Sequence, residues 1–305
     1  MRGELDIVSG IRIAGFARKI DAKIIHCHTA GAHSLALLSR ILRRAKLVVT
    51  RRVDFPLKGG KASVWKYRKA DHLIAISTKI YDVLLNSGIP EKNLTLVPSG
   101  VLLSDAVDKD RTSKILSELQ ISPEDKIIGT IAALVGHKDY YTLLRAFSEV
   151  VSEIPNVVLL ALGEGDDLPQ IQTFAKETGV DDRVKFLGFR EDVGDFFGLF
   201  DVYVQASKME GLCSTIIEAM YHKLPIAATS AGGIPDLIEH NVTGLLSPPQ
   251  NPELLAENIL KLLKNPQEYR HLREAAHLKS KLFSAENMVS KTEEVYIKLL
   301  KEPNA

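Results

Sequence analysis

The sequence has few cysteines and no long apolar run, and each absence excludes a class of protein. Only Cys27 and Cys213 are present among 305 residues, which excludes the disulfide framework of a small secreted domain. The N-terminus has no apolar signal core, and no run of about 18 apolar residues occurs, so the sequence predicts neither a secretory signal nor a membrane-spanning helix. We therefore expect a cytoplasmic protein that is reduced and globular.

A net charge of +1 conceals two oppositely charged halves. Residues 1–104 contain 18 Lys and Arg against 7 Asp and Glu, whereas the remainder contains 21 against 31. The basic side chains cluster at residues 39–46, 51–52 and 58–69. These clusters fit an anionic membrane at its inner face, an anionic acceptor, or a plain solvated surface. Nucleic-acid binding is not expected, because no recognised binding motif accompanies the charge.

The hydrophobic pattern predicts an α/β protein with two Rossmann-like, doubly wound domains. Strand-like apolar runs alternate with helical patterns, which is typical of parallel sheets with crossover helices. We expect strands at 23–27, 46–50, 72–75 and 94–97 in the first half, and at 126–132, 157–162, 184–187, 201–205 and 225–228 in the second. The intervening first-half helices are expected at 6–20, 32–43, 61–69 and 78–86. Each domain should bind ligands beyond the carboxyl ends of its strands.

The polar stretch at residues 104–113 is interpreted as the linker between the domains. The first domain therefore spans residues 1–104 and the second spans 105–285, ending in a helical tail predicted at 253–263 and 266–283. A last helix at 286–305 is expected to pack back toward the first domain.

Two carboxylates eight positions apart, Glu210 and Glu218, are the best indication of function. They lie in Glu210-Gly-Leu-Cys-Ser-Thr-Ile-Ile-Glu218, which reads as a loop running into a helix. Carboxylates bind sugar hydroxyls, and a helix N-terminus attracts phosphate, so one segment can hold both ends of a nucleotide sugar. The alternatives are a capping box from Thr215 to Glu218 and a solvated loop charge at Glu210.

The motif continues into Leu224-Pro-Ile-Ala-Ala-Thr-Ser-Ala-Gly-Gly-Ile-Pro-Asp236 and Asn241-Val-Thr-Gly-Leu-Leu-Ser-Pro248. Together these segments resemble the family 4 retaining glycosyltransferases, which implies the GT-B fold. The resemblance covers essentially all 305 residues but matches only the latter part of that family's first domain and its entire second domain. The N-terminal domain is therefore expected to lack its first strand–helix units, which leaves one sheet edge open to self-association.

The resemblance also implies roles for residues of the second domain. Glu210 would accept hydrogen bonds from donor-sugar hydroxyls, Glu218 would bind the ribose, and Lys138 would neutralise the leaving diphosphate. The loop amides expected near the sugar and diphosphate are those of Gly211, Leu212, Cys213 and Ser214. Relatives commonly carry Arg where this chain has Ala133, and His137 or Lys208 are candidates to compensate.

Further positions complete the predicted site. Gly163 follows a strand and permits close approach to a ligand. Phe189 and Arg190 are implied to lie beside the base; the alternative has Phe189 in the core and Arg190 in solvent. His28 is implied to contact donor or acceptor, with a structural histidine as the alternative. Because His26 and His28 are expected on opposite faces, no metal pair is predicted.

The sequence thus predicts a metal-independent, cofactor-independent retaining glycosyltransferase. Its donor would be a nucleotide-diphosphate sugar, and its acceptor a cell-envelope glycan or a lipid-linked molecule. Two alternatives stay open: a non-catalytic remnant that binds a nucleotide sugar or a partner, and a sugar-nucleotide epimerase or hydrolase on the same fold.

Overall fold

A computed structural model of the chain describes residues 7–40, 45–57, 60–104 and 107–301. The chain divides into two compact units. Unit 1 comprises Met1–Gly100 and Ala285–Ala305, and unit 2 comprises Val101–Ser284. The divisions lie close to the sequence-based boundaries after residues 104 and 285.

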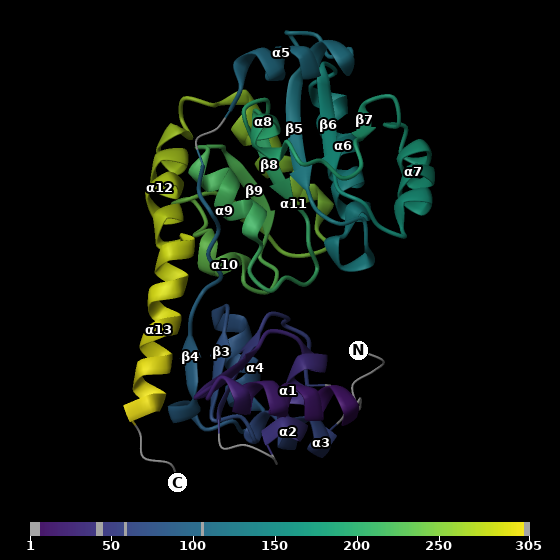
Figure 1. Cartoon of the computed structure of the whole chain (residues 1–305). Helices are drawn as coiled ribbons and strands as arrows, with labels where there is room; N and C mark the ends of the chain where they lie inside the picture. The colour runs from purple at the N-terminus through teal and green to yellow at the C-terminus, as the bar shows by residue number, and fades with distance from the viewer. Residues whose placement is uncertain (1–6, 41–44, 58–59, 105–106, 302–305) are drawn as a thin grey trace. The chain divides into compact units, whose positions relative to one another are not determined.

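Unit 1 contains a four-stranded parallel sheet in the order β1-β2-β3-β4 (Figure 1). Its strands are β1 (Ile24–Cys27), β2 (Lys46–Arg51), β3 (His72–Ala75) and β4 (Leu94–Leu96), as predicted. Because successive right-handed crossovers in one direction place their helices on one face, that face carries the intervening helices. They are α2 (Ala30–Arg40), α3 (Gly60–Arg68) and α4 (Thr78–Asn86).

The other face of this sheet is covered by the end of the chain. Side chains of Val48, Ile74 and Val97 point to this face and pack against Val295 and Leu299 of α13 (Ala285–Lys301). All five are buried, so burial of apolar surface holds the first and last segments of the chain together.

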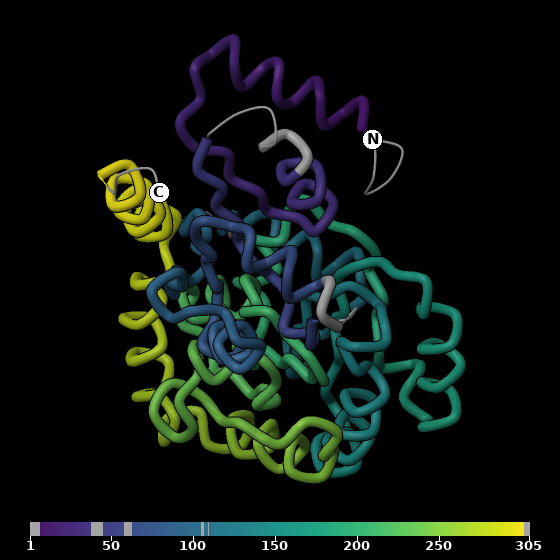
Figure 2. Tube along the Cα trace, turned by 90° about the horizontal axis from the view of Figure 1, so that it is seen from below, coloured from purple at the N-terminus to yellow at the C-terminus, as the bar shows by residue number. Residues whose placement is uncertain are grey.

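The edge strands of this sheet within the described residues are β1 and β4. The preceding helix, α1 (Ile7–Lys19), packs against α2 and lies at the margin of unit 1 (Figure 2). Among the described helices, none combines the length and hydrophobicity needed to cross a membrane.

Unit 2 contains a six-stranded parallel sheet in the order β10-β9-β8-β5-β6-β7. The strands are β5 (Lys126–Ile131), β6 (Val157–Leu162), β7 (Val184–Phe186), β8 (Val202–Gln205), β9 (Ile226–Thr229) and β10 (Leu245–Ser247). The order runs outward in both directions from β5 and β8, which is the pattern of a Rossmann-type sheet. The topological switch point, where such sheets bind ligands, therefore lies between β5 and β8.

Helices on both faces enclose the core of unit 2. The apolar stripe of α6 (Tyr140–Glu153) buries Leu144, Phe147 and Val150 against β6, whose six side chains are all buried. The helix α11 (Pro252–Lys264) covers the neighbouring strands through Leu255 and Ile259. The remaining helices are α7 (Leu168–Glu177), α8 (Val193–Phe197), α9 (Ser214–Tyr221), α10 (Ile234–Leu237) and α12 (Arg270–Ser280).

The structure corrects the predicted linker at 104–113. Residues Lys109–Glu118 form α5, capped by Asp108, whose side chain accepts hydrogen bonds from the amides of Asp110 and Arg111 at 3.0 and 3.2 Å. Ile115 of this helix, just beyond the predicted linker, is buried, so a tertiary contact stabilises a mostly polar segment. Two of the ten residues predicted as linker, 105 and 106, lie outside the described residues.

Candidate active site

The loops that follow the strands of unit 2 are hydrogen-bonded to one another along the carboxyl edge of the sheet. The amide of Lys208, after β8, donates to the carbonyl of His137, after β5, at 2.8 Å. The amide of Gly233, after β9, donates to the carbonyl of Glu210 at 2.9 Å. The amide of Gly163, after β6, donates to the carbonyl of Gly188 at 2.8 Å. These bonds form a rim of fixed backbone at the place where the fold binds ligands.

Lys138 and Glu210 meet at the switch point. Lys138 ends the short helix η2 (Gly136–Lys138) after β5, and Glu210 lies in the loop after β8, so 72 positions of sequence separate them. The Lys138 Nζ donates a short hydrogen bond to Glu210 Oε2, and only 16% and 12% of the two side chains are exposed. The sequence predicted both residues for the donor site, and the fold brings them into direct contact.

The electrostatic surroundings keep this lysine charged. Burial opposes the charge on Lys138, but Cys213 and Glu210 beside it, and the hydrogen bond to Glu210, together raise its pKa. Since burial raises the pKa of the Cys213 thiol to about 11, that thiol is neutral at pH 7 and Glu210 supplies the negative charge. The result is a desolvated ammonium at a ligand-binding edge, where its field acts more strongly than in water.

A buried polar chain positions Glu210. Ser207 Oγ donates to Glu210 Oε2 at 3.3 Å, and Gln205 Nε2 donates to Ser207 Oγ at 2.8 Å. Thr229 of β9 fixes the same loop by donating to the carbonyl of Ser207 at 2.6 Å. Because Gln205, Ser207 and Thr229 are almost fully buried, the carboxylate is attached to the rigid sheet.

Two glycines permit the close approach of these loops. Gly232 has φ +53°, and a Cβ atom added there would overlap the carbonyl of Glu210. Gly163 has φ +133°, and a Cβ atom there would overlap the carbonyl of Ala132. The close approach that the structure gives Gly163 is to the backbone after β5; its predicted approach to a ligand stays a prediction.

The predicted amide-bearing segment leads directly into α9. Leu212 and Cys213 are buried, Gly211 is half-buried and Ser214 is exposed. Cys213 occupies the N-cap position with φ +75°, and its side chain makes no capping hydrogen bond. The helix thus starts two residues earlier than the capping box requires, and the Thr215 hydroxyl bonds with that of Tyr203 at 2.7 Å. The capping-box interpretation of Glu218 is therefore wrong.

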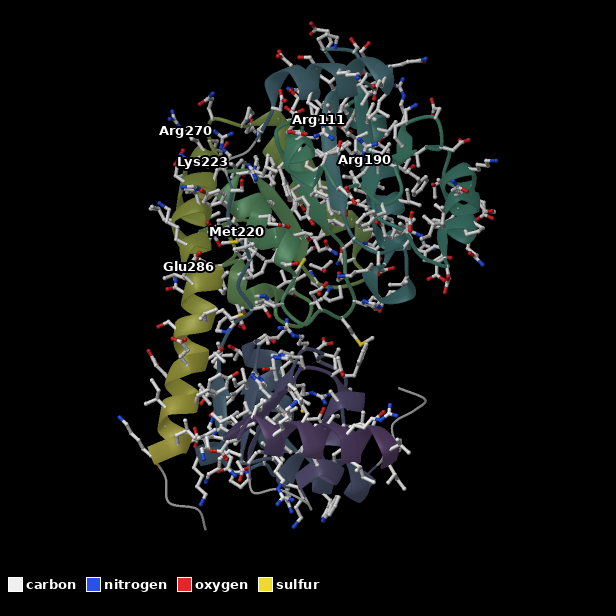
Figure 3. All side chains as sticks on the ribbon, in the orientation of Figure 1. Arg111, Arg190, Met220, Lys223, Arg270 and Glu286 are labelled. Atoms are coloured by element: carbon white, nitrogen blue, oxygen red, sulfur yellow. The ribbon has the colours of Figure 1, made fainter. Side chains whose placement is uncertain are left out.

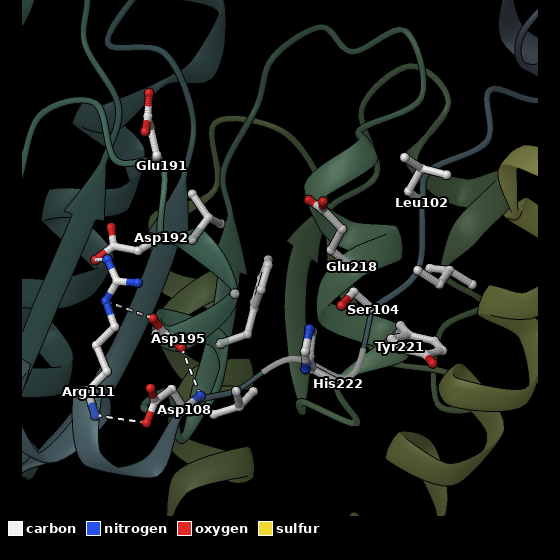
Figure 4. Close-up of a pocket in the computed structure, with 15 residues that line it drawn as sticks. Leu102, Ser104, Asp108, Arg111, Glu191, Asp192, Asp195, Glu218, Tyr221 and His222 are labelled. Atoms are coloured by element: carbon white, nitrogen blue, oxygen red, sulfur yellow. Dashed lines mark hydrogen bonds and ion pairs between the residues drawn. The ribbon is translucent and has the colours of Figure 1, made fainter.

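Glu218 borders a separate cavity of about 600 Å³ in unit 2. Figure 4 shows Glu218 on the α9 side of this cavity, across from the segment between β7 and α8 that carries Glu191 and Asp192. Burial raises the pKa of Glu218. A half-buried carboxylate beside a cavity is suited to accept hydrogen bonds from ligand hydroxyls.

Phe189 and Arg190 follow β7, and neither is placed as the alternative interpretation predicted. Phe189 is 69% exposed, so it does not pack in the core. Arg190 is fixed by Asp192, donating from Nε at 2.8 Å and from Nη2 at 2.6 Å, rather than extending freely into solvent. Arg111 also reaches Asp192, at 3.2 Å, and Figure 3 shows the two arginines on the same part of unit 2.

The expected second cation of the donor site is absent at position 133, where Ala133 is exposed. Lys208, one candidate to compensate, forms an ion pair with Asp139 at 3.2 Å. Asp139 is the N-cap of α6, so this pair joins the loops after β5 and β8 close to Lys138. His137 precedes Lys138 in the same short helix.

His28 belongs to a cavity of about 260 Å³ in unit 1. It follows β1 directly and is exposed, while His26 on β1 is hydrogen-bonded to the hydroxyls of Tyr296 and Thr50. Burial, and then the charge of Arg52, lower the pKa of His28; burial, His28 and Arg52 lower that of His26 to about 4. Both imidazoles are therefore neutral at pH 7.

The expectation that His26 and His28 lie on opposite faces is wrong. Their ring centroids are 4.1 Å apart, because strand side chains repeat with a period of two. Within the described residues, no group of three His, Cys, Asp or Glu side chains is placed to hold a metal ion.

Sequence reasoning missed the contribution of α13 to this cavity. Met288, Thr292, Glu293 and Tyr296 line it together with the strand ends. The last helix was expected to pack back toward the first domain, but its amphipathic pattern does not specify which of its side chains line a cavity.

Fold and site together define the chain as a two-unit α/β protein with its candidate catalytic pair at a Rossmann-type switch point. The family model described as "Glycosyl transferases group 1" matches residues 112–279, and that described as "Glycosyltransferase Family 4" matches residues 2–105. The first match covers more than half of the chain. The chain therefore belongs to the group 1 glycosyltransferases.

Relatives of known name support this assignment. The chain is 26% identical to the N-acetyl-alpha-D-glucosaminyl L-malate synthase of Bacillus anthracis, over 97% of this chain and 80% of that protein. It is 24% identical to the alpha-monoglucosyldiacylglycerol synthase of Acholeplasma laidlawii, over 78% of this chain but only 61% of that protein.

A solved structure has the same fold. The HepE protein of Anabaena, crystallised in complex with UDP-glucose, superposes with a TM-score of 0.87 at 21% identity. The superposition covers 95% of this chain and 82% of that one. The fold is that of the GT-B glycosyltransferases, as the sequence predicted.

Proposed function

We propose that this glycosyltransferase moves a sugar from a nucleotide-diphosphate sugar to a hydroxyl of a cell-envelope or lipid-linked acceptor, with retention of anomeric configuration. The observation that carries the proposal is the buried pair of Lys138 and Glu210 at the switch point of unit 2. The names of the similar proteins support it: one structure contains UDP-glucose, and two relatives are named for products with malate and with diacylglycerol.

The chemistry assigns one role to each member of the pair. The ammonium of Lys138 stabilises the negative charge that develops on the diphosphate as the anomeric C–O bond breaks. The carboxylate of Glu210 accepts hydrogen bonds from sugar hydroxyls and orients the ring. The acceptor oxygen attacks the anomeric carbon from the face that the diphosphate leaves, and the acceptor proton passes to the leaving phosphate oxygen. No side-chain nucleophile and no metal takes part in this route.

We expect Glu210→Gln to lower the rate of sugar transfer roughly 100-fold, because a neutral amide oxygen is a weaker acceptor than a carboxylate and does not pair with the charge of Lys138. The measurement is nucleoside diphosphate release from a panel of nucleotide sugars, with acceptor and with EDTA present. The control is Glu153→Gln, which removes a carboxylate that pairs with Lys264 at 2.8 Å on the surface of the same unit. Equal rates in the two variants would contradict the assignment of Glu210.

The same assay separates the alternatives. An epimerase or hydrolase converts the nucleotide sugar without acceptor, and a binding remnant retains donor affinity but releases no product with any acceptor. A transferase requires both substrates, and its product keeps the anomeric configuration of the donor, which NMR of the product determines.

We expect Glu218→Gln to weaken donor binding about tenfold while making the protein more stable at neutral pH. Burial raises the pKa of Glu218, so the folded state binds its proton more tightly than the unfolded state does. The stabilisation from that proton is present at low pH and is lost as the pH rises through the raised pKa. Removing the charge should therefore raise the melting temperature at pH 7.

This stability difference should shrink as the pH falls below the ordinary glutamate value of 4.5. The control is Glu257→Gln, an exposed position paired with Lys261 on α11, which should change neither donor affinity nor this pH dependence. Unchanged donor affinity in Glu218→Gln would remove Glu218 from the binding site.

A further inference from the structure

The cavity beside His28 in unit 1 is built from both ends of the chain. It lies at the carboxyl ends of the strands of unit 1, and one wall is α13. Its volume of about 260 Å³ suits a small molecule or a headgroup rather than a long glycan. Its polar lining comes from His26, His28, Thr50, Arg52, Ser99, Thr292, Glu293 and Tyr296.

Two adjacent arginines at the end of β2 have different roles. Arg51 is buried, donates to the Tyr67 hydroxyl at 2.8 Å and to the carbonyl of Phe55, and lies over the Tyr67 ring. Arg52 is exposed, lines the cavity, and donates from Nη1 to Ser99 Oγ at 3.1 Å. The Arg51 guanidinium therefore stabilises the fold, whereas the Arg52 guanidinium presents hydrogen-bond donors to a ligand in the cavity.

The charges that face the cavity are distributed over two walls. Arg52 carries a positive charge on the strand side, and Glu293 carries a negative charge on the helix side. His26 and His28 are neutral at pH 7, and the positive field of Arg52 contributes to their lowered pKa values. A ligand that satisfies both walls has an anionic group for Arg52 and hydroxyl groups for Glu293 and His28.

We propose that this cavity selects an acceptor that carries a carboxylate or phosphate beside its hydroxyl groups, with the anion bound by Arg52 and Ser99. This inference rests on the proposed function, since it names the class of acceptor for the same reaction. A free hydroxy acid or phosphate ester and the headgroup of an anionic lipid share this chemistry. Guanidinium groups suit both anions because they donate two parallel hydrogen bonds.

The test compares three-carbon probes that differ only in the anionic group: glycerate, glycerol 3-phosphate and neutral glycerol. Calorimetric titration of the whole protein should give at least about tenfold tighter binding for one of the anions than for glycerol. Vesicles of phosphatidylglycerol, compared with phosphatidylcholine, test the lipid source. Binding to the vesicles alone identifies a headgroup acceptor, and binding to the free anions alone identifies a soluble one.

Arg52→Gln should weaken binding of the anion at least about tenfold, and Arg52→Lys should retain part of it. The control is Arg18→Gln, which removes an exposed arginine from the end of α1 in the same unit. Bound anion should also raise the pKa of His28 in ring NMR spectra, because a nearby negative charge favours the imidazolium. This shift should saturate with added anion and should be absent with glycerol.

Three results would overturn the proposal: glycerol binding as tightly as the anions, Arg52→Gln binding them as wild type does, or no binding of any probe or vesicle. None of these depends on turnover. Donor binding and Glu210-dependent product release without an anion preference would leave the proposed function intact and refute the acceptor class. Anion binding that depends on Arg52, without sugar transfer, would refute the proposed function instead.

Discussion

Lys138→Met should lower the rate of sugar transfer by roughly 10²- to 10³-fold, because the variant has no charge to stabilise the leaving diphosphate. It should also destabilise unit 2 by up to about 3 kcal/mol, since Glu210 would remain buried without its partner. The pair raises the pKa of Lys138, so its contribution to stability is present throughout neutral pH and disappears only as the pH rises beyond the usual lysine range.

The double variant Lys138→Met/Glu210→Gln separates catalysis from folding. Removing both charges should restore most of the lost stability but none of the activity, and urea unfolding together with product release measures the two effects. Lys264→Met is the matched control, because the pair of Lys264 and Glu153 is about half exposed and surface pairs contribute little. A double variant that regains activity would show that the pair only supports the loop.

Gly232→Ala should abolish most of the activity through the backbone alone. The added methyl group would overlap the carbonyl of Glu210, and the residue would retain an unfavourable φ of +53°. The loop must then move, which displaces the carboxylate from Lys138. We expect a loss of stability of at least about 2 kcal/mol and a fall in transfer of roughly 100-fold.

Gly179→Ala provides the control for backbone strain without overlap. Gly179 also has positive φ, +69°, but a Cβ atom there would meet nothing within 4 Å. It should therefore lose about 1 kcal/mol of stability and keep full activity. If the two variants behave alike in transfer assays, the approach of Gly232 to Glu210 has no functional importance.

The sequence predicted that Lys138 and Glu210 act together because their positions depend on strand order and local motifs. Parallel strands present their carboxyl ends at one edge, so Lys138 after β5 and Glu210 after β8 were expected to act together. What could not be predicted was their direct ion pair. It depends on the backbone hydrogen bond between Lys208 and His137 and on the small size of Gly232.

The features that sequence reasoning missed depend on tertiary packing. The helix α5 is mostly polar, and it is held at its capped start and through the buried side chain of Ile115. Asp192 gathers Arg111 and Arg190 from different parts of the chain, and no local pattern marks such a partner. The separate cavity next to Glu218 likewise arises from packing between loops.

The position of α13 in unit 1 has a consequence for biosynthesis. The face of the sheet formed by Val48, Ile74 and Val97 stays open to solvent until Val295 and Leu299 have left the ribosome. Unit 2 is continuous in sequence and can complete its own core earlier. Unit 1 must therefore wait. A chain released early would have a complete unit 2 but a unit 1 whose cavity lacks the wall formed by α13, and it would expose apolar surface that chaperones and proteases recognise.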